Sequence, residues 1–187
     1  HNYSKQFDAD RAEMMQRSID AGVSKFFLPN VDLESLPRMH SLCNQFPQHC
    51  FPMMGLHPCS VEENYLKDLT WVEQYLFNRS NELHFEKFYA VGEIGLDYYW
   101  DKTFIPQQKD AFRKQISWAQ QLHLPIAVHA RESMDDILEI IEEQQDGTLT
   151  GVLHCFTGNI KQAQKGIGLN FYLGIGGVVT FKNSGLD

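Results

Sequence analysis

The chain alternates short apolar runs with longer amphipathic stretches, and this rhythm constrains its fold more than any other feature of the sequence. Several runs are rich in β-branched or aromatic residues and apolar on both faces, as buried parallel strands are. We expect strands at residues 25–28, 51–55, 89–93, 126–129, 152–155 and 171–174. Strands joined by helical crossovers run parallel, so the sequence predicts an α/β fold.

The stretches between these runs carry apolar residues at helical spacing, together with helix start and stop signals. A helix over residues 8–21 would end at Gly22, and the capping-box pattern at residues 60–63 would start another. Three further helix starts are marked by a proline or a capping residue: Pro106, Ser133 and Asn159. The expected order is therefore strand then helix, repeated along the chain.

Two α/β architectures accommodate six such units, and periodicity alone leaves both open. One is a doubly wound open sheet, and the other is a TIM-type (β/α) barrel, which closes with eight strands and is typically about 250 residues long. With 187 residues, 43% of them hydrophobic, the chain is long enough for one core and too short for two ordinary domains. We expect a single domain over residues 1–187.

The charge of the chain limits how it can meet nucleic acid. Its formal net charge is -8, whereas nonspecific affinity for nucleic acid comes mainly from Lys and Arg that neutralise phosphates. Metal ions would therefore have to bind the phosphates of a nucleic-acid substrate. No run approaches the roughly 20 apolar residues that cross a bilayer, and the first residues lack a signal-peptide pattern. We expect a cytoplasmic protein with no membrane partner, and we predict no protein partner.

Polar residues gather at the C-terminal ends of the expected strands, in the segments GLHP (55–58), GEIGLD (92–97), VHAR (128–131) and LHCFTG (153–158). In a parallel barrel these ends share one mouth, where four side chains would converge: His57, Glu93, His129 and His154. Imidazole and carboxylate groups bind zinc, manganese and similar ions, and one carboxylate can bridge two of them. A single strand-end histidine is more often a core or rim residue, but the four placements together favour a shared metal site bridged by Glu93.

The other polar residues beside these ends have two interpretations each. Arg131 would hold a phosphate with its bidentate fork, or form a salt bridge on the barrel rim. Asp97 and the aromatic residues at 98–100 would line a substrate groove by stacking, or pack a loop onto the rim. The remaining histidines lie in expected helices or loops, where we give them a surface role: His40, His49, His84 and His123.

The segments GLHP, VGEIGLDYY, IAVHAR and GVLHCFTG resemble, in order and spacing, those of the TatD-type metal-dependent deoxyribonucleases, a family of the metallo-dependent hydrolase superfamily. The resemblance covers the whole chain. It implies a TIM-type barrel with two divalent metal ions (Mg, Mn or Zn). Glu93 would be the catalytic bridge between them, and the further metal ligands would be His1, His129 and His154. The substrate contacts that we expect are His57, Arg131 and Asp97.

The sequence departs from the family pattern at two places. The family's first strand ends in a His-x-His pair, and His1 matches the second member of that pair. The eighth strand of the family ends in an aspartate within a Thr-Asp-Ser-Pro-like motif, which is missing here. Asp187 follows a polar loop, so we do not give it that role. We therefore expect a barrel whose first and eighth strands are missing, in a domain truncated at both ends.

The predicted function is metal-dependent hydrolysis of DNA phosphodiester bonds by a metal-activated water. An exonuclease mode of action is implied by the resemblance alone. Two alternatives stay open. Related barrels use the same ligands on carbonyl centres, so the substrate could be an ester, a lactone or an amide. The missing ligands also leave room for a non-catalytic metal-binding scaffold.

Overall fold

The computed structural model describes residues 1–79 and 83–185, so Asp187 lies outside the described residues. Within these ranges each predicted strand is present, and β3 continues to Asp97 where the sequence predicted an end at Glu93. The strands are β1 (Phe26–Pro29), β2 (Cys50–Met53), β3 (Val91–Asp97), β4 (Ile126–Arg131), β5 (Gly151–Leu153) and β6 (Phe171–Leu173).

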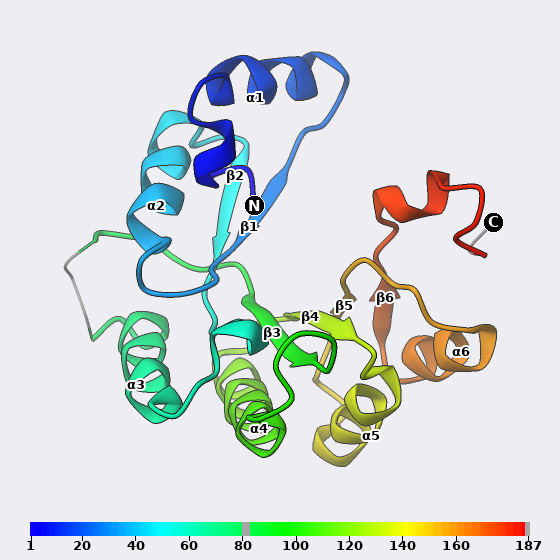
Figure 1. The fold of residues 1–187 in the computed structure, drawn as a ribbon. Helices are drawn as coiled ribbons and strands as arrows, with labels where there is room; N and C mark the ends of the chain where they lie inside the picture. Colours follow the sequence, from blue (N-terminus) through cyan, green and yellow to red (C-terminus); the bar gives the residue numbers. More distant parts are fainter. Residues whose placement is uncertain (80–82, 186–187) are drawn as a thin grey trace.

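The order of the strands in space follows their order in the sequence. β1 pairs with β2, while β3, β4, β5 and β6 form a second sheet in that order, and every pairing is parallel. A parallel bridge between Met54 and Val91 joins the two groups. A doubly wound sheet reverses its strand order at a switch point, whereas a barrel adds each strand beside the previous one. The structure therefore has the barrel-type order, and Figure 1 shows the strands following one another round an open arc.

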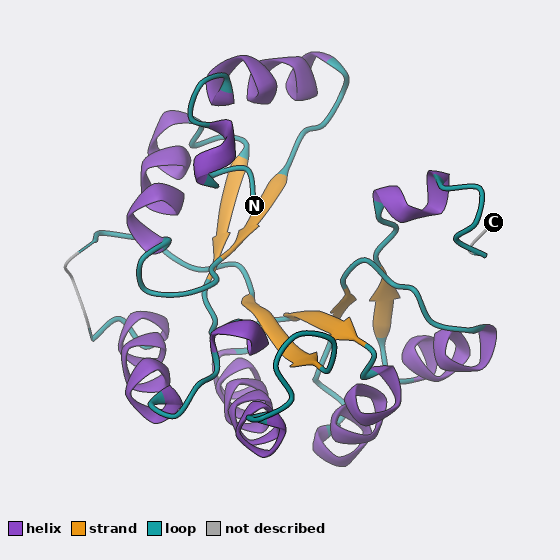
Figure 2. Cartoon of the chain, viewed as in Figure 1, coloured by secondary structure: helices purple, strands orange, loops and turns teal. Residues whose placement is uncertain are grey.

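Helices cover the outer side of this arc, as Figure 2 shows. They are α1 (Arg11–Asp20), α2 (Leu36–Gln45), α3 (Tyr65–Leu76), α4 (Ile105–Leu122), α5 (Met134–Gln144) and α6 (Ile160–Gly168). Three short 3-10 helices complete the described elements: η1 (Lys5–Phe7), η2 (Pro58–Ser60) and η3 (Gly177–Thr180). In the two described ranges, no helix combines the length and the apolar character that a membrane crossing requires.

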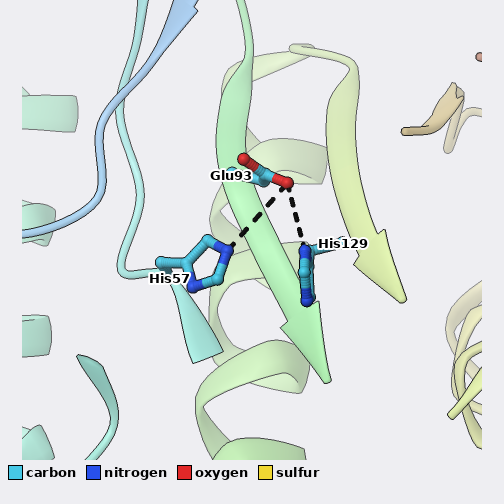
Figure 3. Close-up of side chains that lie close together, drawn as sticks. All are labelled: His57, Glu93 and His129. Atoms are coloured by element: carbon cyan, nitrogen blue, oxygen red, sulfur yellow. Dashed lines mark ion pairs between the residues drawn. The ribbon is translucent and has the colours of Figure 1, made fainter. Parts of the chain in front are cut away.

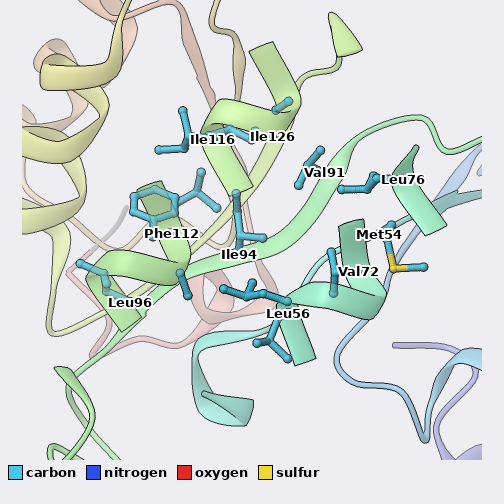
Figure 4. Close-up of a cluster of buried hydrophobic side chains, with 14 of the residues drawn as sticks. Met54, Leu56, Val72, Leu76, Val91, Ile94, Leu96, Phe112, Ile116 and Ile126 are labelled. Atoms are coloured by element: carbon cyan, nitrogen blue, oxygen red, sulfur yellow. The ribbon is translucent and has the colours of Figure 1, made fainter. Parts of the chain in front are cut away.

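The largest part of the core lies between β3 and α4. β3 is buried along its whole length, and its side chains alternate between the two faces of the sheet in the part that follows an irregularity before Ile94. Ile94 and Leu96 point outward, where Phe112 and Ile116 of α4 belong to the same buried cluster (Figure 4). Full burial of such a side chain stabilises the fold by about 1.5–3 kcal/mol. Glu93 lies on the opposite, inner face of the strands.

The helix starts predicted from proline and asparagine are confirmed. Pro106 lies in the first turn of α4, where its missing N–H costs nothing. Asn159 caps α6: its side chain accepts from the backbone N–H of Gln162, and the Gln162 side chain accepts from the backbone N–H of Asn159. These signals are local, so the sequence alone was enough to find them.

Two other helix predictions need correction. The pattern at residues 60–63 does not start a helix, because Ser60 closes η2 and α3 begins at Tyr65. Ser133 does precede α5, but its hydroxyl donates to the carbonyl oxygen of Leu96 at 2.7 Å instead of capping the helix. In addition, α2 was not predicted from the sequence, although a proline stands in its first turn.

Candidate metal centre

One glutamate and four histidines from separate segments meet on the inner face of the strands. Glu93 and His129 lie within β3 and β4. His57 directly precedes η2, His154 comes directly after β5, and His1 precedes η1. The parallel arrangement brings these strand ends together, so the predicted convergence is present in the structure.

Glu93 is at the centre of this group. Its side chain is almost completely buried, with 4% exposed. One carboxylate oxygen, Oε2, lies 3.4 Å from Nε2 of His1. The other, Oε1, lies 3.3 Å from Nδ1 of His129, 3.9 Å from Nε2 of His154 and 4.0 Å from Nε2 of His57. Figure 3 shows His57 and His129 directed at this same oxygen. The two oxygens of Glu93 therefore face different histidines.

A chain of hydrogen bonds determines which nitrogen of His1 carries the proton. The hydroxyl of Tyr3 donates to the carbonyl oxygen of Pro29, so its oxygen accepts from Nδ1 of His1, 3.2 Å away. Burial raises the pKa of Tyr3 well above its ordinary value, which keeps the hydroxyl proton in place. With its proton on Nδ1, His1 presents the lone pair of Nε2 to Glu93. This role of Tyr3 was not predicted from the sequence.

Asp97 orients His129 in the same way. Nε2 of His129 donates to Oδ2 of Asp97 at 2.8 Å, so in the neutral ring Nδ1 presents its lone pair to Glu93. Oδ1 of Asp97 accepts from the backbone N–H groups of Tyr99 at 3.0 Å and Trp100 at 3.2 Å. Asp97 was predicted as a substrate contact, but it is 2% exposed and both its oxygens have partners. Its position is that of a carboxylate that orients an imidazole, as carboxylates beside metal ligands do.

His57 has the opposite tautomer. The backbone N–H of Cys59 donates to Nδ1 of His57 at 3.1 Å, so the proton of the neutral ring lies on Nε2. That N–H points toward Glu93, and a nitrogen that carries a proton cannot bind a metal. By distance alone, ligand atoms of His57, Glu93 and His129 lie within 4.8 Å of one another and could hold an ion. The hydrogen bond from Cys59 makes His57 a donor in this group.

Burial and charge set the protonation of these groups. Burial would raise the pKa of Glu93, but the facing His1 and His129 outweigh burial and hold this pKa below its ordinary value, so the carboxylate is ionised. Burial, followed by the nearby His129, lowers the pKa of His57 to about 4, so His57 is neutral at pH 7. Burial also opposes a charge on His129, but its contacts with Glu93 and Asp97 outweigh burial and raise its pKa.

The donor set fits divalent metal ions. Two imidazole nitrogens with lone pairs face the ionised Glu93 at 3.3 and 3.4 Å, and such groups repel one another unless a proton or a metal lies between them. Imidazole nitrogen and carboxylate oxygen are ligands that zinc and manganese accept. His154, with 57% of its side chain exposed, adds a third imidazole on the side of Oε1.

Two glutamines of α4 hold the backbone beside the centre. The amide of Gln115 accepts from the N–H of Leu56 at 2.7 Å and donates to the carbonyl oxygen of Leu56 at 3.2 Å. The amide of Gln108 forms the same pair with Asp97, at 2.9 and 3.2 Å. Both glutamines are buried. Neither was predicted from the sequence, although two polar residues two turns apart on an apolar helix face were a visible signal.

The loop after β3 brings two aromatic rings to the rim of the centre, beside an arginine at the end of β4. The guanidinium carbon of Arg131 lies 3.8 Å from the ring centroid of Tyr99 and 5.4 Å from that of Trp100. Within the described residues no carboxylate lies within 4.0 Å of Arg131, so the salt bridge that the sequence left open is not formed. Tyr98 points elsewhere, and its hydroxyl donates to Asp136 at 2.5 Å.

Comparisons with known proteins identify a family for the chain. The model of the TatD-related DNase family matches residues 1–186. The uncharacterized metal-dependent hydrolase YabD of Bacillus subtilis is 33% identical over 98% of this chain and 69% of its own length. The 3'-5' ssDNA/RNA exonuclease TatD of Cronobacter sakazakii is 30% identical over 98% of this chain and 67% of its own length. The crystal structure of YjjV, a TatD homolog from Escherichia coli K12, has a TM-score of 0.85 and 29% identity, and the match covers 97% of this chain and 67% of YjjV.

A parallel barrel-type fold with histidine and glutamate side chains at its strand ends is the arrangement of a metal-dependent hydrolase. The chain belongs to the TatD-related DNase family. It spans about two thirds of the length of the relatives that it matches. The family predicted from the sequence motifs is thus confirmed, and the likeness to YjjV confirms the TIM-type fold.

Proposed function

We propose that this protein hydrolyses phosphodiester bonds of single-stranded DNA or RNA from a strand end, with divalent metals held by His1, Glu93, His129 and His154. The observation that carries the proposal is that the two carboxylate oxygens of Glu93 face different histidines. Oε2 faces His1, while Oε1 faces His129 and His154. A carboxylate whose two oxygens face separate ligands is suited to bridging two ions. The name of the exonuclease from Cronobacter sakazakii supports the choice of substrate.

Divalent ions at this site would supply an activated water and neutralise charge on the phosphate. The residues of the chain divide the remaining tasks. Glu93 is the catalytic carboxylate, because its ionised oxygens determine where the positively charged metal ions would bind. Tyr3 and Asp97 keep the lone pairs of His1 and His129 directed toward that place. We assign both of them as positioning residues.

His57 and Arg131 are the groups that we propose to contact the substrate phosphate. His57 is neutral at pH 7 and offers its Nε2–H beside Glu93, so it can donate to a phosphate oxygen without competing for a metal. The guanidinium of Arg131 stacks on an aromatic ring, and no carboxylate of the described residues pairs with it. Its N–H groups are therefore available to a phosphate. With a formal net charge of -8, the chain needs such local contacts.

The test uses the protein in its encoded length with a single-stranded oligonucleotide labelled at its 5′ end, and with Mg²⁺, Mn²⁺ or Zn²⁺ added in turn. Glu93→Gln preserves the size of the side chain but removes the charge, so we expect the rate to fall on the order of 100-fold or more. The matched control is Glu132→Gln, which makes the same change on an exposed residue directly after β4. We expect the control to cleave like the unaltered protein.

Each outcome of this test is decisive. Metal-dependent shortening of the strand by the unaltered protein and by Glu132→Gln, but not by Glu93→Gln, supports the proposal. Equal cleavage by Glu93→Gln, or cleavage in the presence of EDTA, refutes it. Hydrolysis of aryl esters, lactones or amides without any cleavage of phosphodiesters would identify a hydrolase of carbonyl centres. Absence of all these activities with every metal would leave a non-catalytic metal-binding scaffold.

A further inference from the structure

The loop that follows β3 exposes an aromatic surface at the rim of the metal centre. Trp100 is 68% exposed and Tyr99 is 47% exposed, and their rings meet edge to face with centroids 4.8 Å apart. Large aromatic side chains are usually buried, because burying them removes much apolar surface from water. Two neighbouring aromatic rings that stay accessible therefore mark a surface able to bind another flat group.

Arg131 makes this surface rigid. Its guanidinium stacks 3.8 Å from the ring centroid of Tyr99, a distance at which the cation is attracted to the face of the ring. A ring held in this way loses little conformational entropy when a ligand binds. The guanidinium also keeps N–H groups available, since no carboxylate lies within 4.0 Å of it in the described part of the chain. A flat ring and a phosphate donor therefore stand side by side.

Hydrogen bonds connect the aromatic surface to the metal centre. The carboxylate of Asp97 holds His129 with one oxygen and the backbone N–H groups of Tyr99 and Trp100 with the other. Arg131 is the register partner of Asp97 across the β3–β4 pair, and it comes two residues after His129 on the same face of β4. A ligand on the aromatic rings would therefore lie beside the side chains that face Glu93.

We propose that Trp100 and Tyr99, supported by Arg131, form a stacking platform for an unpaired nucleobase of the strand being hydrolysed. The proposal deepens the function proposed above, since it assigns the substrate preference of that site to named residues. Every base has a π face that can stack on an aromatic ring, but in a duplex both faces are covered by neighbouring base pairs. The platform therefore selects single strands and tolerates any sequence.

The platform also suits the charge of the protein. Binding through phosphates alone would need many Lys and Arg residues, whereas the chain has a formal net charge of -8. Stacking requires no net positive charge, so it can supply affinity where a basic surface is missing. We expect the affinity for single strands to depend only weakly on salt, with a slope close to that of one or two phosphate contacts.

The test measures binding of a fluorescent single-stranded oligonucleotide by anisotropy, with EDTA present so that the strand stays intact. Trp100→Ala should weaken binding about 5- to 150-fold, which is the effect of removing one stacked base. Trp100→Phe keeps a ring and should bind within a few fold of the unaltered protein. The matched control is Leu66→Ala on α3, which removes an apolar side chain of similar exposure (53%) and should bind like the unaltered protein.

A second strand, with abasic sites in place of its terminal bases, separates stacking from loop structure. The loss caused by Trp100→Ala should largely vanish with this strand, because there is no base left to stack. Loss of equal size on both strands, unchanged binding by Trp100→Ala, or no binding by the unaltered protein at millimolar strand would each overturn the platform. Because EDTA removes the metals, the result is independent of hydrolysis: failure of the Glu93 test refutes the activity, and failure of this one refutes the platform.

Discussion

Replacement of Asp97 by asparagine tests most directly how the metal centre is organised. Asp97 accepts from His129 with one oxygen, at 2.8 Å, and from the backbone N–H groups of Tyr99 and Trp100 with the other, at 3.0 and 3.2 Å. An asparagine has only one oxygen. If this oxygen were given to His129, two backbone N–H groups would face an NH₂ donor, at a cost of about 1–3 kcal/mol each. We therefore expect the amide NH₂ to face His129.

This orientation would change the tautomer of His129. Nε2 would have to accept from the asparagine, so the proton would move to Nδ1, the nitrogen that faces Glu93 at 3.3 Å. A protonated nitrogen cannot bind a metal. Loss of a supporting carboxylate of this kind lowers metal affinity about 10- to 100-fold, or about 1.4–2.8 kcal/mol. We expect Asp97→Asn to weaken metal binding by such a factor and to leave the protein folded.

Isothermal titration calorimetry of the metal-free protein with Mn²⁺ or Zn²⁺ measures this affinity without relying on activity. The matched control is Asp101→Asn in the same loop, which removes the same charge. Asp101 accepts from the backbone N–H of Thr103 at 2.8 Å, and an amide oxygen can replace it there. The reasoning is refuted if Asp97→Asn binds metal like the unaltered protein. It is also refuted if both variants lose affinity equally, because the effect would then be one of net charge.

Three further predictions follow from the surroundings of the centre. Gly95→Ala should lower the free energy of unfolding by about 2 kcal/mol or more, because Gly95 has a φ of +142° and a Cβ would overlap the carbonyl oxygen of His129. An unchanged Tm would contradict this prediction. Gln115→Leu should lower the free energy of unfolding in urea by about 2–4 kcal/mol, because it leaves the backbone N–H and C=O of Leu56 buried without partners. The control Gln121→Leu changes an exposed glutamine and should alter this free energy by less than about 0.5 kcal/mol. Metal affinity should fall by up to about tenfold per pH unit below the raised pKa of His129, because a metal that binds there displaces one proton. Calorimetry that shows no proton release on metal binding would exclude this pH dependence.

The sequence by itself determined the features that depend on local pattern. Apolar runs of strand length, separated by helical stretches, were enough to predict the six parallel strands. The polar residues after these runs were enough to name the side chains that meet around Glu93, since parallel strands place their C-terminal ends at one edge. Periodicity could not choose between a barrel and a doubly wound sheet, because both use the same repeated unit. The family motifs favoured the barrel, and the strand order in the structure agrees with them.

Only the tertiary structure decided which role each of these side chains has. The proton of an imidazole lies where its hydrogen-bond partner requires it, and the partners come from distant parts of the chain. Asp97 and His129 are 32 positions apart, and the Tyr3 hydroxyl that fixes His1 is anchored 26 positions away at Pro29. Arg131 stacks on an aromatic ring of another segment in the same way. No local pattern records such a pairing, because folding creates the contact.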